Sequence, residues 1–223
     1  MSPEGKMWLR VAITLILIGS ALFLAAGTFD YWQAWTFLGV VTVSSALLTL
    51  SMARSPTLLE NRSRFGPAAE KRTAQKIILL CAMVPACATF IVPALDRRFG
   101  WSNVPSWLSI AGDILILAGM WMVSRVFEAN PFGSATVEIA NDQKVISTGP
   151  YAVVRNPMYA SGAVYLIGVP LALGSYWGLI AAFLTILGLV WRLFDEEELL
   201  AQDLPGYTEY CAKVHWHLIP GVF

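Results

Sequence analysis

Long apolar stretches without charge, separated by short polar segments, dominate the chain. Between Val11 and Ala53 the only charged residue is Asp30, and no charge occurs from Ile77 to Leu95 or from Asn156 to Trp191. Uncharged apolar runs of about 18 residues or more are typical of membrane-spanning helices. The pattern therefore predicts an integral membrane protein built from helices.

We predict an all-α fold, a polytopic membrane bundle of about four spans plus a C-terminal membrane hairpin. The last apolar block, Met158–Phe194, is too long for one span and is interrupted by Pro170 and Gly174, so it should form two helices with a turn near Leu173–Tyr176. A cleavable signal peptide at the start is the less favoured alternative, because the first run is long enough to span. The first four spans are expected at about Met7–Phe29, Tyr31–Met52, Ile77–Leu95 and Pro105–Val126.

Composition supports this class. Hydrophobic residues make up 57% of the 223 residues and charged residues only 13%, about half of the share usual in soluble domains. A water-soluble globule and a nucleic-acid-binding protein are thereby excluded. The three cysteines and two histidines lack metal-ligand spacing, so we expect no metal, and His215 and His217 are expected to be surface or headgroup contacts.

Basic residues set the expected orientation. The segment Arg54–Lys76 holds six basic residues against Glu60 and Glu70, and positively charged loops face the cytoplasm. We therefore expect a basic cytoplasmic loop over 53–76 within an N-terminal part, 1–126. A catalytic region, 127–223, would include the membrane hairpin 157–194 and place its polar segments in the cytoplasm. The expected location is the inner or plasma membrane.

The first chemically informative segment precedes the hairpin. Asn156 and Pro157 are a strong helix start, because Asn caps with its side chain and Pro is favoured at the first helical position. The positive end of that helix would suit a carboxylate or phosphate, and Arg155 adds donors. Tyr151 and Tyr159 either stack on a flat ring such as adenine or anchor the chain at headgroup depth.

The second segment follows the hairpin. Arg192 and Glu196 are four residues apart and share one helix face. Residues Asp195–Glu198 place four carboxylates at a helix C-terminus, where the helix dipole disfavours negative charge. Either this departure from the helix-dipole preference marks a functional site, or the helix extends into water with acidic outer faces.

Together these segments resemble the isoprenylcysteine carboxyl methyltransferase family, which is related to the phospholipid N-methyltransferases. The resemblance covers about residues 127–220, and its motifs are short singly but fairly specific in their order and spacing. The matching strings are KVISTGPY (Lys144–Tyr151), RNPMY (Arg155–Tyr159), WRLFDEEE (Trp191–Glu198) and GYTEYCAKVHWHLIP (Gly206–Pro220).

The resemblance implies methyl transfer from S-adenosyl-L-methionine to a lipophilic or small thiol, carboxylate or amine acceptor in a membrane-embedded site. It implies that Arg192 holds the acceptor and that Glu196 contacts the cofactor, so these two are the candidate catalytic residues. Asn156 stands where the family has His, and an amide cannot act as a base near neutral pH. The candidate cofactor-binding residues are Lys144, Val145, Ile146, Ser147, Gly149, Tyr151, Arg155, Asn156, Pro157, Met158, Tyr159, Glu196 and Glu197.

Two other functions stay open. A membrane reductase of the sterol-reductase type would bind NADPH in the same C-terminal region, and a basic cluster for its extra phosphate would favour it. A non-catalytic membrane scaffold with the same fold is the other alternative, and Asn156 in place of His is its best argument. Besides the lipid bilayer and the acceptor, no partner is indicated.

Overall fold

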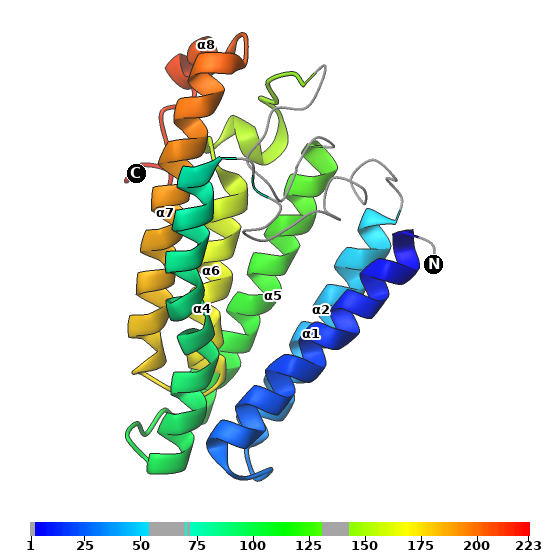
Figure 1. Ribbon diagram of the computed structural model, residues 1–223, viewed down its shortest axis with the longest axis vertical. Coiled ribbons are helices and arrows are strands. Elements are labelled where there is room, and N and C mark those ends of the chain that lie inside the picture. The colour runs from blue at the N-terminus through cyan, green and yellow to red at the C-terminus, as the bar shows by residue number, and fades with distance from the viewer. Residues whose placement is uncertain (1–2, 54–69, 71, 131–142) are drawn as a thin grey trace.

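The computed structural model describes residues 3–53, 70, 72–130 and 143–223, and every regular element within them is a helix (Figure 1). The predicted all-α class is therefore confirmed. The elements are α1 (Pro3–Ala26), α2 (Trp32–Met52), α4 (Thr73–Phe99), α5 (Ser106–Ala129), the short 3-10 helix η1 (Gly149–Ala152), α6 (Pro157–Ala172), α7 (Gly178–Asp203) and α8 (Tyr207–Lys213).

Five of these helices, α1, α2, α4, α5 and α7, are long and apolar enough to cross a membrane, judged by length and composition. The sixth apolar helix, α6, has only 16 residues and forms the predicted hairpin with α7. The expected arrangement of four spans followed by a hairpin is thus confirmed. Several helices extend beyond their expected limits. The helix α1 begins at Pro3, α4 runs from Thr73 to Phe99, α5 ends at Ala129, and α7 continues through the acidic run to Asp203.

The helices α4, α5, α6 and α7 form one bundle, and the α1–α2 hairpin leans against it at an angle (Figure 1). The three turns that join α1 to α2, α4 to α5 and α6 to α7 gather at one end of the molecule, here called the turn end. The opposite end, here called the site end, carries α8, η1, the start of α6 and the start of α4.

A buried carboxylate ties the turn end together. Asp96 is 1% exposed and accepts hydrogen bonds from the Ser102 backbone N–H and hydroxyl, both at 2.6 Å, and from the Ser175 hydroxyl at 2.5 Å. The Tyr31 hydroxyl donates to the Leu173 carbonyl at 2.6 Å. These bonds join all three turns and fix the helix ends at the turn end.

Glycines bring α5 and α6 into backbone contact. A Cβ atom on Gly112 would lie 2.2 Å from the Ala172 backbone nitrogen, and one on Gly168 would lie 2.8 Å from the Gly112 carbonyl oxygen. Membrane helices associate closely through such small residues, because lipid tails provide no hydrophobic driving force between helices. This contact sets the position of α6, whose far end begins the candidate site.

Candidate active site

The start of α6 lies against α7 at the site end. Pro157 is the first residue of α6, as predicted, and Asn156 precedes it. The expected side-chain cap is wrong, because the Asn156 side chain makes no capping bond to the helix. Its Nδ2 instead donates to Glu197 Oε1 at 2.5 Å, and a bond to a charged acceptor is stronger than a neutral capping bond.

A second bond joins the same two helices one turn further along. The Tyr159 hydroxyl donates to Glu196 Oε2 at 2.5 Å. The two chemically informative segments of the sequence, far apart in the chain, therefore meet side chain to side chain. Both contacts lie where α6 enters the bundle and α7 leaves it.

Arg192 has an acidic partner that the sequence did not predict. Its Nη2 lies 2.7 Å from Glu70 Oε1, and the two side chains are 10% and 0% exposed. Glu70 precedes α4 and is one of the two acids in the basic loop region. The guanidinium that the resemblance assigns to an acceptor is thus already paired within the protein.

The start of α4 also binds the acidic run. Gln75, which is fully buried, donates from Nε2 to Asp195 Oδ2 at 2.5 Å. Arg72 forms an ion pair with the same carboxylate at 3.2 Å and donates to the Asp195 carbonyl at 3.1 Å. The N-terminal end of α4 is therefore held to α7 by charge as well as by apolar packing.

The C-terminal segment after α8 forms a third wall. The backbone N–H groups of Arg155 and Asn156 donate to the carbonyls of Trp216 and His217 at 2.8 and 3.0 Å. His217 also reaches the site with its ring, because Nδ1 lies 3.0 Å from Glu197 Oε2. The expectation that His217 is a surface or headgroup contact is wrong, since docking of this segment turns the ring inward.

The acidic run is compensated locally. Asp195 is bound by Gln75 and Arg72, Glu196 by Tyr159, and Glu197 by Asn156, His217 and Arg155. Glu198 is exposed and contacts Gln202, one turn along α7. The run is therefore both a helix extension and a binding surface for neighbouring segments. Nearby, burial and the charge of Glu197 raise the pKa of Tyr207 well above its ordinary value, so its hydroxyl stays protonated.

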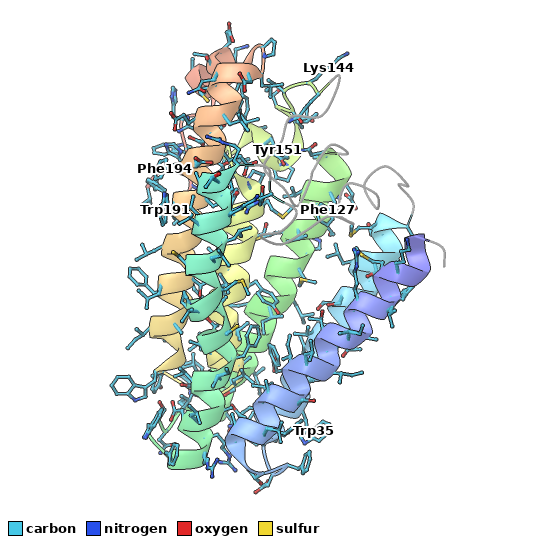
Figure 2. All side chains as sticks on the ribbon, in the orientation of Figure 1. Trp35, Phe127, Lys144, Tyr151, Trp191 and Phe194 are labelled. Atoms are coloured by element: carbon cyan, nitrogen blue, oxygen red, sulfur yellow. The ribbon has the colours of Figure 1, made fainter. Side chains whose placement is uncertain are left out.

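The remaining candidate cofactor-binding residues lie on different elements and differ in exposure. Tyr151 lies in η1, and its hydroxyl accepts from Asn130 Nδ2 at 2.9 Å. Lys144 is exposed and lies farther from the bundle than Tyr151 (Figure 2), and Ser147 is exposed too. Val145 packs on α8 instead of entering the α6–α7 contact. Ile146 and Met158 are half-buried, Pro157 is buried, and Gly149 starts η1 with a φ of +60°.

A comparison with known families concerns the same part of the chain. Residues 107–204 match the family model described as phospholipid methyltransferase. The match spans α5 except its first residue, η1, α6 and all of α7, so it includes both bonds between α6 and α7. It confirms the predicted enzyme class, a methyltransferase. No curated protein matches this chain.

Several contacting residues lie outside the matched stretch and were missed by sequence reasoning. Glu70 and Gln75 precede it and His217 follows it, yet each touches a residue within it. Their only signals in the sequence are an acid within a basic segment and a histidine beside Trp216. Among the described residues, no group of three or more His, Cys, Asp or Glu side chains is suited to hold a metal ion.

Proposed function

We propose that this protein is an integral-membrane methyltransferase that moves a methyl group from S-adenosyl-L-methionine to a lipid-like acceptor. The observation that carries the proposal is the meeting of α6 and α7 through Tyr159–Glu196 and Asn156–Glu197 inside the stretch matched to phospholipid methyltransferases. The match supports the class of reaction, and the two contacts supply a site for it.

The donor and acceptor groups at the site end fit this cofactor. Carboxylates such as Glu196 complement its ammonium and sulfonium charges, and Arg155 complements its carboxylate. Tyr151 and Tyr159 offer aromatic faces for its adenine ring. The chain has no G-x-G turn, the usual cofactor-binding device of soluble proteins, so the cofactor would be held by helix ends.

The cofactor supplies an electrophilic methyl group on a positively charged sulfur that leaves as a neutral thioether. Methyl transfer then forms one bond from the acceptor's lone pair to the methyl carbon and breaks the carbon–sulfur bond, whose electrons stay on sulfur. The protein has to align the two reactants and exclude water, which in such reactions accounts for several kcal/mol. Glu196, held by Tyr159, would fix the cofactor end of this alignment.

The pairing of Arg192 supports one class of acceptor over another. Because Glu70 already neutralises this guanidinium, an acceptor carboxylate would have to displace Glu70 to reach it. An amine-bearing lipid instead meets a site rich in carboxylates, and losing a proton to water leaves its nitrogen free to attack. We therefore place a lipid amine ahead of the prenylcysteine carboxylate that the isoprenylcysteine resemblance implies.

We also propose that the site end faces the cytoplasm. The support is the excess of basic residues between Arg54 and Lys76, which leads from α2 to α4 at this end. In this orientation the water-soluble cofactor arrives from the cytoplasm, and the lipid acceptor arrives within the bilayer. Residues 1–126 then serve as a membrane scaffold, and their Glu70 pairs with Arg192 of the catalytic region 127–223.

Calorimetric titration of the purified protein in detergent with S-adenosylhomocysteine, and in parallel with NADPH, tests the class of cofactor. We expect micromolar binding of the former and none of the latter. Each described arginine of the site is paired with a carboxylate, so little positive charge is available to bind the extra phosphate of NADPH. These arginines are Arg72, Arg155 and Arg192. Binding of NADPH alone would favour a reductase, and binding of neither by folded protein would favour a scaffold.

Variants test the placement of the site. Glu196→Gln and Arg192→Ala should each abolish transfer of labelled methyl to lipid. Arg97→Ala serves as the control, because Arg97 lies near the turn end, donates to the Asp30 carbonyl and should leave turnover intact. Normal turnover by both site variants would contradict the assignment.

A further inference from the structure

Both ring nitrogens of His217 are engaged at the site end. Nδ1 lies 3.1 Å from Glu197 Oε1 and 3.0 Å from Oε2, and Nε2 lies 2.5 Å from Arg155 Nη2. The ring also stacks on Phe223 with centroids 5.1 Å apart and meets the edge of Phe194 at 5.5 Å. The imidazole is thus fixed by polar contacts within its plane and by aromatic contacts around it.

These contacts define one protonation state. Arg155 is only a hydrogen-bond donor, so Nε2 must be the acceptor in that contact, and Glu197 is only an acceptor, so Nδ1 must carry the hydrogen. The arrangement therefore requires a neutral imidazole with its proton on Nδ1. A proton added to Nε2 would remove the bond from Arg155 and set two positive groups against each other.

Glu197 links this imidazole to the proposed cofactor site. Its Oε1 accepts from Asn156 Nδ2 at 2.5 Å and lies 3.5 Å from Arg155 Nε. Three side chains thus share one carboxylate, and two of them, Asn156 and Arg155, are candidate cofactor contacts. A change in the charge of His217 would therefore affect Asn156 through Glu197, and Arg155 both through Glu197 and by direct contact.

The other groups that face this cluster do not offset such a change. From α8, Tyr207 and Cys211 lie close to Arg155 and Glu197, and the raised pKa of Tyr207 keeps its phenol neutral. Phe194 of α7 and Phe223 of the C-terminus carry no charge. Arg155 and Glu197 are therefore the charged side chains in direct contact with the ring among the residues described.

We propose that His217 is a positioning residue of the methyltransferase site. With its proton on Nδ1 it orients Glu197 and Arg155, and loss of these contacts weakens cofactor binding. This inference rests on the proposed function for its link to the cofactor, but the tautomer follows from the contacts alone.

The first test does not depend on any ligand. The chain has only two histidines, so a long-range proton–nitrogen correlation spectrum of histidine-labelled protein in micelles shows two rings, and His215→Asn identifies them. We expect His217 to carry its proton on Nδ1. A proton on Nε2, alone or together with one on Nδ1, would overturn the proposal.

The second test measures calorimetric binding of S-adenosylhomocysteine to His217 variants at one fixed pH. His217→Phe keeps the stack on Phe223 but loses both polar contacts, so it should bind roughly tenfold more weakly than the wild-type protein. His217→Asn retains a donor toward Glu197 and should lie between the two.

His215→Asn is the matched control, because it also removes an imidazole, and that side chain is exposed two residues away. It should reproduce the wild-type affinity. Wild-type affinity in His217→Phe would show that packing alone suffices, and an affinity in His217→Asn no better than in His217→Phe would show that the donor toward Glu197 does not position the site. Either result overturns the proposal, whereas absence of binding by the wild-type protein contradicts the proposed function and leaves the spectrum to decide the tautomer.

Discussion

Glu70→Gln is the substitution that most directly tests how the site is built. It keeps the size of a fully buried side chain and removes the negative charge 2.7 Å from Arg192. Breaking a buried ion pair on one side costs about 3–5 kcal/mol, because the remaining charge stays buried without compensation. Arg192 also interacts with Tyr159, so we expect about 3 kcal/mol, the lower end of this range.

The free energy of unfolding in mixed micelles measures this cost. Glu128→Gln provides the matched control, since Glu128 pairs with Arg125 on the surface, where both side chains are about half exposed. Exposed ion pairs contribute about 0–1 kcal/mol, so the control should stay close to wild type. The double variant Glu70→Leu with Arg192→Met should recover most of the stability but no methyl transfer, because apolar replacement of both partners is close to neutral.

Two results would refute this reasoning. If Glu70→Gln unfolds with the same free energy as Glu128→Gln, the ion pair is not buried in solution. If the double variant is as unstable as Glu70→Gln, the instability comes from lost packing and not from an unpaired Arg192.

Three further predictions concern other contacts. Gly112→Ala should destabilise the protein by about 1–3 kcal/mol through overpacking against α6, whereas Gly39→Ala, with open space around its Cβ position, should not lower the thermal midpoint in detergent. Tyr159→Phe removes a hydrogen bond to a carboxylate and should weaken calorimetric binding of S-adenosylhomocysteine roughly tenfold without unfolding the protein. Asp96→Asn should lower the thermal midpoint, because it replaces a buried acceptor of three hydrogen bonds, and Asp30→Asn, with its exposed side chain, should not.

The helices could be predicted from the sequence because a membrane imposes a strong pattern. The uncharged runs predicted the limits of α1, α2 and α5 to within a few residues. Pro170 and Gly174 predicted the turn between α6 and α7. The extra turns of α4 and α7 were missed because they leave the apolar region and carry polar residues. Hydropathy reports where a helix is buried in lipid and not where its hydrogen bonds stop.

The site was predictable only in part, for a related reason. The family resemblance of two short motifs placed Tyr159 and Glu196 in one site, and the structure joins them by a hydrogen bond. Glu70 contacts Arg192 from more than a hundred residues away in the chain. His217 contacts Glu197 from about twenty residues away. No local pattern encodes such long-range pairing. The side chain of Asn156 was likewise misassigned because its competing acceptor, Glu197, is 41 residues away.

The length of α6 has a consequence for the depth at which the reaction takes place. Its 16 residues span about 24 Å, less than the roughly 30 Å of a bilayer's hydrocarbon core. With the α6–α7 turn at one boundary of that core, the start of α6 stops short of the other boundary, and the Tyr159–Glu196 contact lies within the hydrocarbon region below the lipid headgroups. On the proposed function, a lipid acceptor would present its reactive group without being lifted out of its leaflet. The water-soluble methyl donor would then have to reach below the headgroups to meet it.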